Sequence, residues 1–196
     1  MTNYPQKAAT IFDLEFTAWE GSLKRRWLGP GEFTELVQIG AVKLDPVTFE
    51  PLGEFEILVK PRLNAVLSDY LVGLTGITNE EMAARGVDFL EAYRRFVDFV
   101  DGGRMIAFGR DDLIFEGNMR LYGIKDAPPI PSYINVIPWL VKQGFDLYGK
   151  HACDVGPLAG VAFEGHLHNA LDDARSVAAG IKALVERGAP NILLGE

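Results

Sequence analysis

The chain lacks the features that mark secreted and membrane proteins. Cys153 is its only cysteine, so an internal disulfide cannot form, and a reducing, cytoplasmic setting is favoured. The sequence contains no run of about eighteen apolar residues, which a membrane-spanning helix would need. Its first residues, M-T-N-Y-P-Q-K, also lack the apolar segment of a secretory signal. We therefore expect a cytoplasmic protein without a membrane partner.

Positive charge is scarce as well. Lysine and arginine number 19 against 27 aspartate and glutamate residues, which gives a formal net charge of -8. This deficit argues against general electrostatic binding of long nucleic acids. It does not exclude an enzyme that acts on nucleic acid, because acidic residues gathered at a metal site contribute to the same total.

The residues that are abundant predict one folded domain. Hydrophobic residues make up 48% of the 196 positions, which is enough to bury a core and excludes extended disorder. No internal repeat, low-complexity segment or domain boundary is visible. We therefore expect residues 1–196 to form a single domain.

The order of local patterns predicts an α/β fold. Ala8–Phe16, Leu36–Leu44 and Phe49–Lys60 are extended segments, and the turn signal Asp45-Pro46 indicates that the last two pair as antiparallel neighbours. Further strands and helices alternate after them, so a mixed five-stranded sheet flanked by helices is expected. Ser68, Thr78 and Asp88 have the pattern of helix N-caps. The remaining strands are expected over Met105–Phe108 and Tyr133–Val136, and later helices over Asp111–Tyr122, Pro138–Lys142, Asp154–Ala162 and Asn169–Arg187.

Two carboxylates lie unusually close together in the first predicted strand. Within I-F-D-L-E-F-T, Asp13 and Glu15 are two positions apart, so both side chains leave the strand on the same face. Burying two like charges side by side is unfavourable unless a basic group, a metal ion or solvent compensates them. The pair therefore indicates a site of some kind.

Other acidic pairs occur where strands give way to helices. Asp111-Asp112 follows the short strand near residue 106, and Asp172-Asp173 opens the last helix. Groups at strand ends gather at one edge of an α/β sheet, so one acid of each pair is expected to join Asp13. In the last helix Asp173 shares the apolar stripe and is the inward acid. The same test does not separate Asp111 from Asp112.

Four carboxylates without a thiolate cluster favour Mg²⁺ or Mn²⁺ over zinc. Two such ions, about 3.5–4 Å apart, stabilise the attacking and leaving oxygens in phosphodiester hydrolysis. His168 lies in the loop before the last helix, where an imidazole can act as a general base. His166 would act as the base only if the segment before the last helix had a different register.

At this point the motifs resemble a known family, the DEDDh (DnaQ-like) group of 3′→5′ exonucleases, which has a ribonuclease-H-like fold. In detail they resemble the enhanced-RNAi (ERI-1-like) branch, and the resemblance spans about Ala8 to Leu184. One departure is Gln38, where that branch more often has an acid. The motifs are F-D-L-E-F-T-A-W-E, V-K-P-R-L-N-A-V-L-S-D-Y-L-V-G-L-T-G-I-T, A-F-G-R-D-D and H-N-A-L-D-D-A.

The resemblance implies a function and roles for individual residues. It implies removal of nucleotides from single-stranded 3′ ends, RNA or DNA, as nucleoside 5′-monophosphates, with RNA favoured. It also selects Asp112 from its pair. The residues implied are metal ligands at Asp13, Glu15, Asp112 and Asp173 and a general base at His168. The backbone and side chains of Phe16 and Thr17 are implied to contact the terminal nucleotide, and Thr75 and Ile77 belong to the loop Leu74–Thr78, which lies near the same pocket in relatives.

Several alternatives remain open at the level of sequence. A binding protein on the same fold, without catalysis, would interact with nucleic acid or protein. Both a monomer and a homodimer are compatible with the pattern. The segment Lys24-Arg25-Arg26 between Trp19 and Trp27 is either a solvated turn or a contact for phosphates and bases. Cys153 is expected to be a buried thiol, not a nucleophile.

Overall fold

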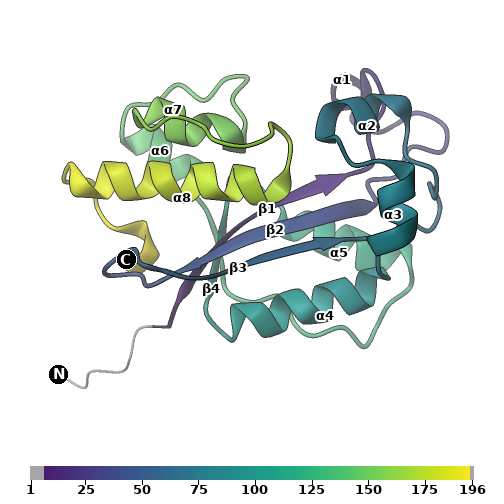
Figure 1. Cartoon of the computed structure of the whole chain (residues 1–196), viewed down its shortest axis with the longest axis horizontal. Helices are drawn as coiled ribbons and strands as arrows, with labels where there is room; N and C mark the ends of the chain where they lie inside the picture. The colour runs from purple at the N-terminus through teal and green to yellow at the C-terminus, as the bar shows by residue number, and fades with distance from the viewer. Residues whose placement is uncertain (1–6, 195–196) are drawn as a thin grey trace.

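A computed structural model describes residues 7–194, and these form a mixed sheet covered by helices on both faces (Figure 1). The sheet has five strands in the order β3-β2-β1-β4-β5. The pairs β1–β2 and β2–β3 are antiparallel, whereas β1–β4 and β4–β5 are parallel. The expected α/β class and five-stranded mixed sheet are confirmed. The strands are β1 (Ala9–Phe16), β2 (Leu36–Leu44), β3 (Pro51–Leu58), β4 (Arg104–Ala107) and β5 (Tyr133–Asn135).

The helices form three groups around this sheet. Helices α6, α7 and α8 lie on one face, α4 and α5 lie on the other, and α1 to α3 lie beyond the end of β1 (Figure 1). The helices are α1 (Ser22–Arg25), α2 (Asp69–Thr75), α3 (Asn79–Arg85), α4 (Phe89–Val100), α5 (Asp112–Leu121), α6 (Ile137–Lys142), α7 (Val155–Leu158) and α8 (Ala170–Glu186), with 3-10 turns η1 (Ala152–Asp154) and η2 (Ile192–Leu194).

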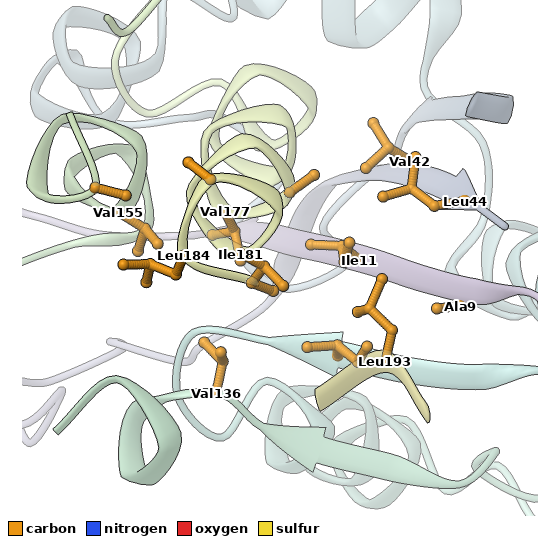
Figure 2. Packing of buried hydrophobic residues seen from close by; sticks show 14 of the residues in the cluster. Ala9, Ile11, Val42, Leu44, Val136, Val155, Val177, Ile181, Leu184 and Leu193 are labelled. Atoms are coloured by element: carbon orange, nitrogen blue, oxygen red, sulfur yellow. The ribbon is translucent and has the colours of Figure 1, made fainter. Parts of the chain in front are cut away.

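Alternation along β1 divides its side chains between two cores. Ile11 packs with Val177 and Ile181 of α8 in one cluster (Figure 2). Phe12 points the other way and packs against Phe96 and Phe115, with ring centroids 5.3 and 5.9 Å away. Because side chains two positions apart share a face, Asp13 and Glu15 continue the Ile11 row towards α8.

The N-caps of three helices have the expected chemistry. The side chains of Ser68, Thr78 and Asp88 accept hydrogen bonds from the backbone N–H groups of Leu71, Glu81 and Leu90. The segment predicted as one helix over Asp154–Ala162 is instead η1 followed by the four-residue α7. Gly156 and Pro157 account for its shortness, since both residues disfavour a helix interior.

Residues 1–6 and 195–196 lie outside the described part, so the expectation of no N-terminal signal falls largely outside the described residues. Among residues 7–194, no helix has the length and apolar character needed to cross a bilayer.

Candidate active site

The site begins at the end of β1. Asp13 pairs with Gly40 of β2 and Glu15 with Gln38, so the two acids are successive side chains on the same face of the sheet. The pairing shifts between Glu15 and Phe16, which ends the regular ladder directly after the second acid. Glu15 is only 8% exposed, whereas Asp13 is partly exposed in the pocket.

The first turn of α8 places a third acid beside Asp13 and Glu15. The Asn169 side chain caps the helix by accepting hydrogen bonds from the N–H groups of Leu171 and Asp172. Asp173 then lies on the inward face with 2% of its surface exposed, as its helical phase predicts. Gly40 permits this approach, because a Cβ there would lie 2.0 Å from the backbone nitrogen of Leu171.

The fourth acid that the structure brings to this pocket is Asp111, whereas the resemblance selected its neighbour Asp112. Asp112 is held by Arg110, whose Nε and Nη2 lie 2.8 and 2.7 Å from its two carboxylate oxygens. Asp111 lines the same pocket as Asp13, Glu15 and Asp173, and its charge acts on Asp13. Asp111 is the N-cap residue of α5, so it lies outside the helix and the helical periodicity does not predict the direction of its side chain.

The turn between β4 and α5 is fixed by a side chain of β5. Asn135 Oδ1 accepts hydrogen bonds from the N–H groups of Gly109 and Ile137. Gly109 has a φ of 122°, which glycine tolerates far better than other residues. Because β1 and β4 are parallel neighbours, this turn ends at the same edge of the sheet as Asp13.

The four acids repel one another strongly in the absence of a cation. Burial raises the pKa of Asp13, and the charges of Asp111, Glu15 and Asp173 raise it further. Burial followed by the charge of Asp173 likewise raises the pKa of Glu15. Burial is also the main cause that raises the pKa of Asp111 and of Asp173 to about 7 each.

The donor atoms of this cluster fit a hard divalent cation. Asp111 Oδ2 and Asp173 Oδ1 are buried and have no hydrogen-bond partner among residues 7–194. Ligand atoms of Glu15, Asp173 and His168 lie within 4.8 Å of one another. Unpaired carboxylate oxygens at a buried site are the ligands that Mg²⁺ and Mn²⁺ prefer. The residues of the chain therefore suit the metal that the sequence predicts.

His168 lies in the loop before α8, as expected, and adopts a φ of 60°. That left-handed conformation is uncommon for a residue with a side chain. Burial lowers the pKa of His168, and the neighbouring His151 and His166 lower it further, so its imidazole is neutral at pH 7. The exposed His166 is instead tied by its backbone N–H to Asp172.

The pocket combines this acidic side with an apolar wall. Its volume is about 430 Å³, and Phe16 lines it together with side chains of α1 and α2. Leu74 belongs to the loop predicted to lie near substrate, and Trp27 adjoins the basic segment considered for base contacts. No role was predicted for Leu23, Tyr70 and Leu71, which also line the wall.

The side chains of three residues predicted to contact substrate serve the framework in this structure, and their contact with substrate stays a prediction. Thr17 is 2% exposed, and its Oγ1 donates to Phe33 O and accepts from Glu35 N. Thr75 is also buried and bonds within its own turn. Ile77 packs in the small core beneath α2.

The basic segment is exposed at the surface. Arg25 does not project freely, since it forms a bidentate pair with Glu32. Lys24 and Arg26 lie in the sequence between the pocket-lining residues Leu23 and Trp27 and are exposed. Their role in substrate binding stays a prediction.

The acid cluster leads to an unusual pH dependence of stability. For Asp111 and Asp173 the folded pKa of about 7 lies above the ordinary value of 3.8, so the folded state retains protons that the unfolded state releases. Their stabilising contribution is complete below the unfolded pKa and is lost as pH rises through 7. We expect the Tm of the protein in chelator to fall by about 5 °C or more from pH 5.5 to pH 8.

Calorimetry or a thermal-shift assay with EDTA measures this slope, and Asp173→Asn is the matched variant. Removal of one acid should flatten the slope, and saturating Mn²⁺ should abolish it in the unmodified protein. An equal slope in the variant and the unmodified protein would assign the pH dependence to other groups.

The chain is similar to known proteins in both sequence and fold. The model of the family RNase_T, described as exonuclease, matches residues 10–180. The 3'-5' exoribonuclease 1 of Mus musculus is 24% identical over 185 residues, covering 86% of this chain and 50% of the mouse protein. The Homo sapiens protein of the same name is also 24% identical, with 49% of its length covered. The chain thus spans about half the length of the curated relatives it matches.

Solved structures share the fold. The nuclease domain of 3'hExo, described as a DEDDh family member bound to rAMP, has a TM-score of 0.79 at 22% identity, with 96% of each chain covered. Cell-death related nuclease 4 has a TM-score of 0.75 at 22% identity, covering 94% of this chain and 66% of that one.

Proposed function

Because the chain belongs to the RNase_T exonuclease family, the DEDDh group of 3′→5′ phosphodiester hydrolases, we propose that it removes nucleotides from the 3′ end of single-stranded nucleic acid. The observation that carries the proposal is the convergence of Asp13, Glu15, Asp111 and Asp173 with His168 around one pocket. RNA is the proposed substrate and DNA the alternative. The curated relatives are named exoribonucleases, and the fold relative 3'hExo was solved with rAMP.

The acids of the pocket are proposed to hold the metal. Asp13, Glu15, Asp111 and Asp173 present oxygen donors on one side of the cavity, and two of these oxygens lack any partner in the described structure. Two bound Mg²⁺ or Mn²⁺ ions would neutralise the acids and stabilise charge on the attacking and leaving oxygens. The rise in the pKa of each acid supports a site built for added positive charge.

His168 is proposed to start the reaction as general base. Its neutral imidazole accepts a proton from a water molecule, whose oxygen attacks the phosphorus of the last phosphodiester. The bond from phosphorus to the 3′ oxygen of the preceding nucleotide breaks, and that oxygen takes up a proton from solvent. The products are a nucleoside 5′-monophosphate and a chain shortened by one unit with a free 3′ hydroxyl.

The apolar wall is proposed to hold the terminal nucleotide. Phe16, Leu23 and Tyr70 face a pocket whose volume of about 430 Å³ is of the size of small-ligand sites. Aromatic and aliphatic side chains pack on bases of any identity, so this wall suits removal of successive nucleotides without sequence preference.

A degradation time course tests the function. Single-stranded RNA and DNA of matched sequence, labelled at the 5′ end, are incubated with the protein in Mn²⁺ or EDTA, with Asp13→Ala as the inactive control. We expect a metal-dependent ladder that shortens from the 3′ end and releases 5′-monophosphates. Intact oligonucleotides of every length, with Mn²⁺ binding retained, would contradict the proposal and favour a binding protein on the same fold.

A further inference from the structure

A buried amide on β2 connects the sheet to the first turn of α8. Gln38 is 1% exposed, and its Oε1 accepts a hydrogen bond of 2.9 Å from the backbone N–H of Ala170. Its Nε2 donates a hydrogen bond of 2.8 Å to Glu56 Oε1 on β3. One side chain thus joins a helix and two neighbouring strands.

The position of Gln38 places this link directly beside the acid cluster. Gln38 lies opposite Glu15 in the β1–β2 ladder, so the two side chains leave the sheet on the same face. The next position on that face of β2 is Gly40, opposite Asp13, where the backbone of α8 makes its closest approach. The acids of β1 and the start of α8 therefore meet over these two residues.

The Ala170 amide is a group that the helix cannot satisfy alone. The first N–H groups of an α-helix have no partner within the helix. Asn169 satisfies those of Leu171 and Asp172, and Gln38 satisfies that of Ala170. Ala170 lies three residues before Asp173 and two after His168, so the turn that carries both functional groups is held by this contact.

We propose that Gln38 is a positioning residue of the active site, which sets the first turn of α8, and with it Asp173 and His168, against the acids of β1; this rests on the proposed function. The amide is the side chain that fits both contacts. A carboxylate at position 38 could accept from Ala170 but could not donate to Glu56, because it is an acceptor only. It would also add negative charge beside Glu15.

Four variants separate these contacts. Gln38→Leu removes both hydrogen bonds, and Gln38→Glu keeps only the bond to Ala170 and repels Glu56. Glu56→Gln retains an acceptor for Gln38 and should behave like the unmodified protein. The double variant Gln38→Glu/Glu56→Gln exchanges donor and acceptor between the two strands and should restore both contacts.

Three measurements are made on each purified variant. Steady-state kinetics on the RNA substrate give kcat and KM, hydrogen exchange by NMR follows the Ala170 amide, and calorimetry gives Mn²⁺ affinity. We expect Gln38→Leu and Gln38→Glu to lower kcat by roughly tenfold to a hundredfold with little change in KM, because misplacement near 1 Å has effects of this size. Faster exchange at Ala170 and weaker Mn²⁺ binding should accompany the loss. The double variant should recover kcat and Ala170 exchange, whereas the negative charge that it keeps beside Glu15 leaves Mn²⁺ affinity out of this comparison.

Glu54→Gln is the matched control, since Glu54 also lies on β3 and bonds to α8 through Arg175 at the surface. It should leave kcat and Ala170 exchange unchanged. Unaltered Ala170 exchange and kcat in Gln38→Leu, or a double variant no better than Gln38→Glu, would overturn the proposal. Because Ala170 exchange and Mn²⁺ binding are read without turnover, an unmodified protein inactive on RNA and DNA would contradict the proposed function alone.

Discussion

Asp111→Asn is expected to lower kcat by at least about 10²-fold, because metal assistance contributes several kcal/mol and each 1.36 kcal/mol is a factor of ten. The substituted amide keeps the volume of the side chain but has one neutral oxygen in place of the carboxylate. One oxygen of the Asp111 carboxylate is buried without a partner in the described part of the chain, and its charge raises the pKa of Asp13, so the charge acts within the cluster. Steady-state kinetics on labelled RNA measure the loss.

The same substitution is expected to stabilise the metal-free protein. In chelator at pH 8 the four acids repel one another, and removal of one charge relieves that repulsion. The Tm of Asp111→Asn should therefore exceed that of the unmodified protein in EDTA, whereas the rise in Tm with Mn²⁺ should shrink. Opposite effects on stability and activity are typical of a group retained for function.

Asp112→Asn is the matched control at the adjacent position. Asp112 is only 9% exposed, but asparagine keeps its volume and an oxygen that can accept from Arg110, whose side chain is 57% exposed. We expect kcat within about threefold of the unmodified value, because Asp111 and not Asp112 lines the pocket. If Asp112→Asn were the inactive variant and Asp111→Asn the active one, the geometry of the turn before α5 would be contradicted.

This pair of aspartates illustrates where sequence patterns stop being informative. Asp173 lies inside a long helix, whose apolar stripe assigns its direction, and the structure agrees with that assignment. Asp111 lies one residue before α5, where no periodicity applies. Alignment of the motif A-F-G-R-D-D selects the neighbour Asp112, and the kinetics of the two variants decide between the two acids. The direction of Asp111 depends instead on Asn135, which fixes the turn from a strand far along the chain.

The strands and their pairing were predictable for a simpler reason. Apolar runs bounded by turn residues depend on local sequence, so β2 was predicted at Leu36–Leu44 without error and β1 to within one residue. Contacts of the pocket wall depend on distant segments. Thr17 is polar and next to the acids, yet its side chain is held in the interior by hydrogen bonds to the segment before β2. Leu23, 69% exposed, lines the pocket from a helix of only four residues.

His168→Ala is expected to lower kcat by roughly 10²–10⁴-fold, the usual contribution of a general base. Because burial and the neighbouring histidines lower its pKa from 6.5, His168 is neutral and competent across neutral pH in the unmodified protein. The acid limb of the kcat profile should therefore lie below pH 6.5 and should disappear in the variant. A pH series from 5 to 9 on labelled RNA measures both effects.

His166→Ala is the matched control for this loss. His166 is exposed, and its contact with Asp172 is made by its backbone, so removal of its imidazole should leave kcat within about threefold, as for most surface substitutions. Added imidazole should partly restore His168→Ala, because a free base of similar pKa can enter the vacated space, and Mn²⁺ affinity should stay unchanged in both variants. A large loss of Mn²⁺ affinity in His168→Ala would mean that the imidazole binds metal, and proton transfer would then belong to another group.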